Sequence, residues 1–362
     1  MKENILKRTE KLREAMAAQE ADAFVVFSDE DSNWESLFYL SGFRGTAGAA
    51  VFTRDSAELL LDSRYAEQGS RQSPHEVAAV KSDLAADTLA MLAAHNAKTV
   101  LCEAQKTSHA MWERLSAEGG AVWRDGSELV KKLRRTKDDE EVSCIRKAAQ
   151  IASDAFLSVL DEFRPGMTEK QFEAALNYKI CLAGGEPGFD MIVASGVRSS
   201  MPHGRATEKP IAAGEWVTVD YGARWNGYFC DITRNFSAGR PDGRAAELHE
   251  LLVKAHRTAA ELLGTGASGT AVHNAALSVL SEAGVGKYFT HSLGHGFGLE
   301  IHEAPLLSAR RNDVLQTGDI VTIEPGVYIE GWGGLRLEDD YLIAETGVQR
   351  LTGMLNQCFY RA

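Results

Sequence analysis

The sequence predicts a two-domain protein in which a small α/β domain precedes a larger α+β domain. With 362 residues the chain is long for a single core, because domains usually hold ~100–200 residues. Short apolar segments alternate with helix-like segments over residues 1–133, which is typical of an α/β domain. Farther along, residues 165–185 and 266–284 echo each other, which favours a pseudo-twofold second domain with helices behind a curved sheet. We expect the domains at 1–133 and 134–362.

The elements of the first domain follow from short apolar runs between polar turns. A switch from basic to acidic residues at 131–140 then marks the domain junction. Thr136 is expected to cap the next helix, whose first turn is acidic as the helix dipole favours. The expected helices of this domain are 5–16 and 84–94, and the expected strands are 23–27, 59–61, 99–101 and 121–123.

Two helices of the second domain carry clear start and stop signals. Thr168 and Gln171 have the spacing of a capping box, and the helix that they introduce should end at Gly184. The segment Gly266–Thr270 introduces the echoing helix, which should end at Gly284. These two helices are the basis of the predicted internal repeat.

Between them, residues 216–236 predict a tight β-hairpin. Asn226-Gly227 is the dipeptide most favoured for a two-residue type I′ turn, because both residues tolerate positive φ. The flanking residues 216–219 and 228–232 are rich in β-branched and aromatic side chains. With this turn, Trp225 should face Tyr228.

The same register brings two acids together. Gly222 should face Asp231, and Asp220 shares a strand face with Gly222, so the two carboxylates lie one diagonal step apart, ~7–8 Å between backbones. Like charges on one face repel unless a cation lies between them. The hairpin therefore indicates a metal site.

A glycine-rich segment at 290–303 supplies histidines. His291 and His295 have the i, i+4 spacing of a helical zinc pair, but glycines at 294, 296 and 298 argue against a helix. An extended segment would spread His291, His295 and His302 in different directions. One histidine could then ligate a metal while the others meet a substrate.

Two further acids follow apolar runs. Residues 319–323 predict a buried strand that ends in Glu324, directly before Pro-Gly. Downstream, Arg336 and Glu338 should share one face of a strand and Leu335 and Leu337 the other. Arg336 is expected to orient acids or contact substrate, with a structural ion pair as the alternative.

Together these segments predict a two-metal centre. Four carboxylates clustered near a core are costly unless they protonate or bind cations, and two divalent ions would neutralise them. One imidazole among oxygen ligands favours manganese or cobalt, and zinc can still enter. Such a centre lowers the pKa of a bound water and polarises a carbonyl. The ligand set is Asp220, Asp231, His295, Glu324 and Glu338.

These elements resemble the metallopeptidases with the pita-bread fold, on the segments Gly294–Gly296, Ile323–Gly326 and Arg336–Asp339. Within that family the chain looks most like Xaa-Pro aminopeptidases and Xaa-Pro dipeptidases (prolidases). The resemblance covers almost the whole chain, including a creatinase-type N-terminal α/β domain with the segments 41–48 and 61–65. The C-terminal segment, Leu351–Cys358, lacks the Pro-Arg/Lys-Glu-Leu ending associated with many of these enzymes.

The resemblance also implies roles for residues. Asp220 would bind one metal in bidentate fashion, Asp231 and Glu338 would bridge, and His295 and Glu324 would complete the other metal. Glu324 also matches the position that handles the proton of the bridging water. Three histidines match positions that line the substrate and stabilise the tetrahedral intermediate; they are His203, in the segment 201–204, His291 and His302. The family also implies a homodimer.

Composition limits the other possibilities. The net charge of −12 offers no basic surface for nucleic acid or an anionic membrane. The five cysteines are widely spaced without a C-x-x-C pair, which favours a reducing cytoplasm over a disulfide framework. The N-terminal residues predict a charged amphipathic helix and no signal peptide or membrane span.

The leading hypothesis is a dimetal Xaa-Pro aminopeptidase that releases the residue before proline from short proline-containing peptides. An Xaa-Pro dipeptidase is the first alternative and differs by requiring a free carboxylate directly after proline. A non-catalytic binding protein on the same fold is the second alternative, and a methionine aminopeptidase the third. Intact ligand positions argue against the binding protein, and the N-terminal domain argues against the methionine aminopeptidase.

Overall fold

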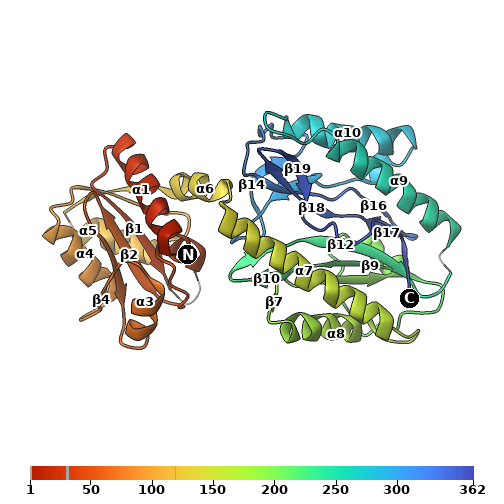
Figure 1. The fold of residues 1–362 in the computed structure, drawn as a ribbon, viewed down its shortest axis with the longest axis horizontal. Coiled ribbons are helices and arrows are strands. Elements are labelled where there is room, and N and C mark those ends of the chain that lie inside the picture. Colours follow the sequence, from red (N-terminus) through yellow and green to blue (C-terminus); the bar gives the residue numbers. More distant parts are fainter. Residues whose placement is uncertain (1, 30–31, 119, 241) are drawn as a thin grey trace. The chain divides into compact units, whose positions relative to one another are not determined.

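The computed structural model describes residues 2–29, 32–118, 120–240 and 242–362. Its contacts divide the chain into two compact units, Met1–Arg134 and Arg135–Ala362 (Figure 1). Among the described residues, each unit has its own clusters of buried apolar side chains. The expected two-domain architecture, α/β followed by α+β, is confirmed.

The first unit is a six-stranded mixed sheet with the order β4-β3-β2-β1-β5-β6. Strand β2 was not expected from the sequence. Its residues Gly48-Ala49-Ala50 have weak β propensity, yet they pair with β1 on one side and β3 on the other and are buried. The strands are β1 (Ala23–Ser28), β2 (Gly48–Thr53), β3 (Ala57–Leu61), β4 (Glu76–Ala79), β5 (Thr99–Cys102) and β6 (Val122–Asp125); the helices are α1 (Lys2–Ala18), α2 (Trp34–Ser41), α3 (Ala66–Gln72), α4 (Leu84–Ala94), α5 (His109–Glu118) and α6 (Ser127–Arg135).

The junction helix α7 (Asp139–Glu162) corrects one expectation. Its N-cap is Asp138 and not Thr136. The Asp138 carboxylate accepts hydrogen bonds from the backbone N–H groups of Glu140 and Glu141, and the Glu141 side chain accepts one from Asp138 N, all at 3.0 Å. Because Thr136 directly follows α6, it lies too early to cap α7, and an acid at the N-cap also suits the helix dipole.

The second unit consists of two similar halves. In the first half, α7 and α8 (Glu169–Leu182) pack on strands β8, β9 and β12. In the second, α9 (Gly243–Ala260) and α10 (Gly269–Glu282) pack on β15, β16, β17 and β18. Figure 1 shows α8 along one edge of this unit and α9 and α10 along the other, with the strands between them. The expected pseudo-twofold repeat is therefore present.

The helix starts in the two halves match the sequence signals. The expected capping box of α8 is present, with Thr168 and Gln171 bonding reciprocally. Ser268 caps α10 at the equivalent position by accepting a hydrogen bond from Ala271 N, without the reciprocal bond, because an alanine side chain has no acceptor. Short 3-10 turns occur at η1 (Gly196–Ser200) and η2 (Gly286–Tyr288).

The described residues of the second unit form sheets with the strand orders β20-β12-β9-β8, β11-β10-β7, β14-β13-β15-β18-β19 and β16-β17. The largest of them contains β13, the strand of the glycine-rich segment, and β15, the apolar strand that precedes Glu324. The strands are β7 (Glu186–Pro187), β8 (Ile192–Ser195), β9 (Trp216–Tyr221), β10 (Ala223–Trp225), β11 (Tyr228–Phe229), β12 (Ile232–Ser237), β13 (Gly294–Gly296), β14 (Glu303–Leu307), β15 (Ile320–Ile323), β16 (Gly326–Ile329), β17 (Gly333–Arg336), β18 (Asp339–Ala344), β19 (Gly347–Arg350) and β20 (Tyr360–Arg361).

The predicted hairpin keeps its register across two of these sheets. Asn226 and Gly227 have φ of 49° and 88°, as a type I′ turn requires, and Trp225 pairs with Tyr228. The same register continues beyond the turn, where Asp220 pairs with Thr233. The hairpin bends at Gly222, where a Cβ atom would lie 2.1 Å from the Cys230 carbonyl oxygen, so only glycine fits.

Candidate metal centre

The acids predicted from the hairpin converge with the others in the second unit. Asp220 lies near the end of β9, Asp231 directly before β12, and Glu338 in the two-residue link between β17 and β18. Potential ligand atoms of Asp231, His295 and Glu338 all lie within 4.8 Å of one another. His295 Nε2 is also 3.5 Å from Glu324 Oε1. Four separate stretches of chain thus meet at one cluster: the hairpin, the glycine-rich segment, the end of β15 and the link between β17 and β18.

The electrostatics of this acidic cluster favour a bound cation. Burial and the charges of Glu338 and Asp220 raise the pKa of Asp231 well above its usual value. Burial and Glu338 do the same to Glu324, and burial and Asp220 raise the pKa of Glu338 to about 8. Asp231, Glu324 and Glu338 therefore resist losing their protons while the neighbouring acids are charged, unless positive charge enters.

The imidazole of His295 is prepared for ligation. Burial lowers its pKa to about 4, so the ring is neutral at pH 7. Its Nδ1–H donates to the Gly296 carbonyl at 3.1 Å, which leaves the Nε2 lone pair facing Asp231 Oδ2 at 3.7 Å. Asp220 Oδ1 and Asp231 Oδ1 are buried and accept no hydrogen bond from any described residue. Neutral imidazole and unpartnered carboxylate oxygens fit divalent metal ions.

Arg336 lies beside this cluster, as expected, but the strand that should carry it is interrupted. β17 ends at Arg336 and β18 begins at Asp339, so the predicted alternation does not run through one strand. The arginine Nη2 donates to Asp220 Oδ2 at 2.5 Å. Its Nε donates to Thr233 Oγ1 at 3.0 Å, and that hydroxyl donates to Glu338 Oε2 at 2.7 Å. Arg336 thus holds one acid directly and a second through Thr233.

The three other predicted histidines lie around the acids. His291 Nδ1 is 3.8 Å from Glu324 Oε2, and the rings of His295 and His302 are 4.5 Å apart. His203 and His302 are exposed, and His203 acts electrostatically on both His291 and His302. None of the three is helical. The glycine-rich segment is therefore not helical, as its sequence indicated, but it is extended at Gly294–Gly296, whereas residues 298–302 are bends.

Comparisons with known proteins match this arrangement. The model of metallopeptidase family M24 matches residues 143–345, and that of the creatinase/prolidase N-terminal domain matches residues 8–136. This chain belongs to metallopeptidase family M24.

Several relatives cover nearly the whole M24 chain. The uncharacterized peptidase YqhT of Bacillus subtilis is 35% identical over 95% of this chain and 97% of its own length. The crystal structure of X-Pro aminopeptidase from Thermotoga maritima has a TM-score of 0.91 at 35% identity, covering 95% of this chain and 98% of that one. The structure titled Xaa-Pro dipeptidase from Bacillus anthracis has a TM-score of 0.94 at 34% identity, covering 99% and 100%. The family assignment makes the chain a metallopeptidase, a hydrolase that uses divalent metal ions.

Sequence reasoning missed Tyr328 in this M24 site. Its hydroxyl accepts a hydrogen bond from Arg336 Nη1 at 2.6 Å and lies 3.0 Å from His291 Nε2. Because the Nδ1–H of neutral His291 donates to the Ser292 carbonyl at 2.8 Å, Nε2 accepts from the tyrosine hydroxyl. The available signal was Gly334, which pairs with Tyr328 across the β16–β17 hairpin and leaves room for the ring.

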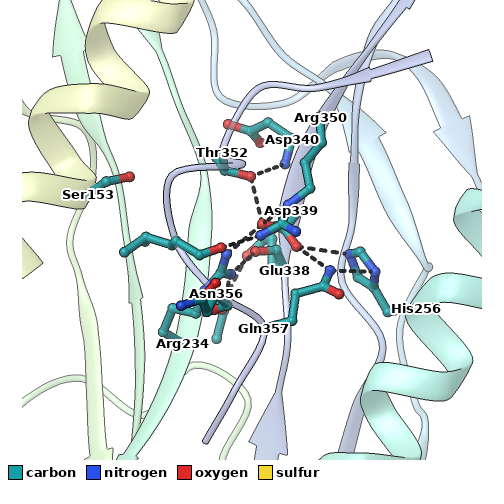
Figure 2. Close-up of polar contacts among 12 residues, drawn as sticks. Ser153, Arg234, His256, Glu338, Asp339, Asp340, Arg350, Thr352, Asn356 and Gln357 are labelled. Atoms are coloured by element: carbon teal, nitrogen blue, oxygen red, sulfur yellow. Dashed lines mark hydrogen bonds and ion pairs between the residues drawn. The ribbon is translucent and has the colours of Figure 1, made fainter. Parts of the chain in front are cut away.

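A second buried network lies next to the metal centre of the M24 chain (Figure 2). Its central anion is Asp339, whose Oδ1 accepts hydrogen bonds from Arg234 Nη2 at 2.5 Å and Thr352 Oγ1 at 2.6 Å. Asp339 Oδ2 accepts one from Gln357 Nε2 at 2.6 Å, and Arg350 Nε lies 3.1 Å from Oδ1. Burial alone would raise the pKa of Asp339, but the positive charges of Arg234 and Arg350 hold it at about 2.

This network also forms a hydrogen bond with the backbone of Glu338, one of the predicted metal ligands. Arg234 Nη1 donates to the carbonyl oxygens of Thr233, at 3.0 Å, and of Glu338. One guanidinium thus joins Asp339 to the peptide of Glu338.

No helix within the described ranges is long and apolar enough to cross a membrane.

Proposed function

We propose that this M24 protein is a two-metal Xaa-Pro aminopeptidase that removes the N-terminal residue from short peptides with proline in second position. The observation that carries the proposal is the cluster of buried acids around a neutral His295, in a chain whose family is metallopeptidase. Relatives named X-Pro aminopeptidase and Xaa-Pro dipeptidase support proline specificity.

The proposed ligands fit a pair of divalent ions. Asp220, Asp231, His295, Glu324 and Glu338 would hold them, with manganese as the proposed metal and cobalt or zinc as alternatives. The bound ions would polarise the scissile carbonyl and make a coordinated water more acidic. The positive charge of the ions would also offset the negative charge of the buried carboxylates.

The residues around the acids supply the rest of the chemistry. Glu324 would take a proton from the attacking water and pass it toward the leaving nitrogen. The exposed His203 and His302 would face the substrate carbonyl and donate to the oxyanion. His291, whose two ring nitrogens are held by Ser292 and Tyr328, would line the substrate beside them. Arg336 keeps Asp220 oriented.

Proline makes this substrate distinct. Its nitrogen carries no hydrogen and its ring fixes φ, so peptidases that grip that N–H or need a flexible backbone act poorly on the bond before proline. A site that instead recognises the carbonyl and the free N-terminus does not depend on that N–H. We further propose a cytoplasmic homodimer, in keeping with the cysteine content and the family resemblance.

The direct test uses metal-stripped protein with Mn²⁺ or Zn²⁺ restored. It is incubated with Ala-Pro and Ala-Pro-Ala, and release of free alanine is followed. Cleavage of the tripeptide is expected. Cleavage of Ala-Pro alone would identify the dipeptidase alternative, an activity that some of the relatives carry in their names. Absence of metal-dependent release from both peptides would contradict proline-peptidase activity and favour the binding-protein alternative.

A further inference from the structure

Glu169, the first residue of α8, is a buried acid whose two oxygens are fully used. Its side chain is 0% exposed. Oε1 accepts hydrogen bonds from the backbone N–H and the hydroxyl of Ser195, both at 2.8 Å. Oε2 accepts from the backbone N–H of Thr207 at 3.1 Å, from its hydroxyl at 2.8 Å, and from the guanidinium of Arg198. Five donors thus converge on one carboxylate.

All five donors come from one stretch of chain, residues 195–207, and His203 lies within it. Further bonds close this segment on itself. Arg198 Nη2 donates to the Arg205 carbonyl at 2.8 Å, and Gly204 N donates to the Met201 carbonyl at 3.0 Å. We call residues 195–207 the His203 loop. The Glu169 carboxylate joins the two ends of this loop, one on each side of the histidine.

The middle of the His203 loop is fixed to the metal centre. Arg336 Nη1 donates to the Pro202 carbonyl at 3.4 Å, directly before His203. Ser199 Oγ accepts a hydrogen bond from Gly334 N at 2.8 Å, on the strand that carries Arg336. The histidine is therefore held between the carboxylate at the loop ends and the Arg336 strand at the loop middle.

Burying the Glu169 carboxylate costs free energy, which suggests that it has a role beyond stabilising the core. A fully buried carboxylate is expensive unless charged and hydrogen-bonded partners compensate it, and apolar residues often stabilise a core equally well. Residues 201–207 form no helix, and an irregular loop without such a clamp would sample many conformations. Fixing it in advance keeps an exposed histidine in a reactive orientation, which is the condition for efficient catalysis.

We propose that Glu169 is a positioning residue for the peptidase reaction, acting through His203. It touches neither substrate nor metal; it sets where the His203 ring meets the substrate carbonyl. This inference rests on the proposed function, because His203 must take part in the reaction.

A double-mutant cycle on the full-length, Mn²⁺-loaded enzyme tests the inference. Glu169→Gln keeps the shape of the side chain but turns one oxygen into an NH₂ group that faces existing donors. We expect kcat for Ala-Pro-Ala to fall between ~10-fold and ~100-fold. His203→Ala should cause a similar or larger fall, and the double variant should be no slower than His203→Ala alone. Mn²⁺ affinity, measured by calorimetric titration, should be unchanged.

The matched control is Glu208→Gln, the same chemical change on a neighbouring acid. The Glu208 side chain is 76% exposed and lies 3.5 Å from Lys170 Nζ in a surface ion pair. The kcat of the Glu208→Gln variant should therefore equal that of the wild type. If Glu169→Gln fails to fold, Thr207→Val removes a single hydroxyl donor to Oε2 and should give a smaller fall that also disappears in the His203→Ala background.

Three results would overturn the inference. If the fold-losses in kcat of the two single variants multiply in the double variant, Glu169 acts independently of His203. If His203→Ala keeps full activity, His203 takes no part in the reaction and Glu169 cannot act through it. A loss of Mn²⁺ affinity that accounts for the fall in kcat would make Glu169 a part of the metal site. A wild type that cleaves neither peptide would instead overturn the proposed function, and the role of Glu169 with it.

Discussion

Glu338 and Asp339 are consecutive buried acids, and their environments are opposite. Glu338 belongs to the metal centre, where burial and Asp220 raise its pKa to about 8. Asp339 belongs to the network of Figure 2, where Arg234 and Arg350 outweigh burial and hold its pKa at about 2. Both side chains are almost fully buried. The sign of the neighbouring charges, and not the depth of burial, therefore decides which acid is ionised.

The difference separates two uses of a buried acid. The network around Asp339 contains its own cations, so it is complete in the polypeptide alone and can stabilise the fold. The acids around Glu338 are faced by the Arg336 guanidinium, and they keep protons or repel one another until further positive charge enters. Substitutions in the two regions should therefore have opposite effects on the metal-free protein.

The largest expected effect is on activity when the metal centre loses an acid. Glu324→Gln should lower kcat between ~100-fold and ~10,000-fold, because the proton carrier is removed. The same change should not lower the thermal midpoint of the metal-free protein, since one of several repelling charges is gone. Peptide hydrolysis and calorimetry with EDTA check both outcomes, with exposed Glu345→Gln as the control. A strongly destabilised metal-free variant would contradict the charge argument.

The network should respond in the opposite way. Asp339→Asn leaves the fully buried Arg234 guanidinium without its anion, which should lower the free energy of unfolding by ~3–5 kcal/mol even without metal. Because Arg234 also binds the Glu338 carbonyl, metal affinity should fall ~10-fold to ~100-fold. Urea unfolding and metal titration measure the two effects, and Asp161→Asn on the exposed face of α7 is the control. An unfolding free energy equal to the wild type would remove the distinction between the regions.

The pH dependence of stability should also distinguish the two acids. The pKa of Glu338 is raised from 4.5 to about 8, so the folded metal-free protein holds this proton more tightly than the unfolded chain. Its contribution to stability is present below pH ~4.5 and is lost as the pH rises toward 8. Asp339, lowered from 3.8 to about 2, contributes above pH ~4 and loses its contribution only in acid.

The measurement is the thermal midpoint between pH 5 and pH 9, with EDTA and with saturating Mn²⁺. With EDTA the midpoint should fall by several degrees as the pH rises, because the acids of the metal centre are forced to ionise beside one another. With Mn²⁺ that fall should be absent or reversed. Parallel curves in the two conditions would show that the acids do not exchange their protons for metal.

The convergence of the acids could be predicted from the sequence because its signals are local. An Asn-Gly turn fixes the hairpin register over the following strands, so Asp220 and Asp231 had to share a face. Glycines at 294, 296 and 298 excluded a helix around His295. The capping box of α8 was equally readable from Thr168 and Gln171. Each of these inferences needs only neighbouring residues.

The rest depends on partners that are distant in the sequence. Arg234 and Asp339 are 105 positions apart, and each alone resembles an ordinary charged residue on a strand. Glu169 meets its loop across 26 to 38 positions. The N-cap of α7 was misplaced because the end of α6, which excludes Thr136, was not predicted. A charge pair matters for stability when it is buried, and burial depends on the tertiary structure and cannot be seen in the neighbouring sequence.

The smallest expected effect tests whether the C-terminal segment belongs to the network. Gln357 lies in the segment Leu351–Cys358, which lacks the ending associated with many proline peptidases, yet its amide donates to Asp339 Oδ2 at 2.6 Å and to His256 Nδ1 at 3.0 Å. Gln357→Ala should cost ~1.5–3 kcal/mol of unfolding free energy, the range for a hydrogen bond to a charged group. Gln349→Ala, which removes only an exposed contact with Arg146, should cost less than ~0.5 kcal/mol. Equal costs in urea unfolding would mean that Asp339 is already satisfied by Arg234, Arg350 and Thr352, and that the C-terminal glutamine adds nothing to the difference between the two acids.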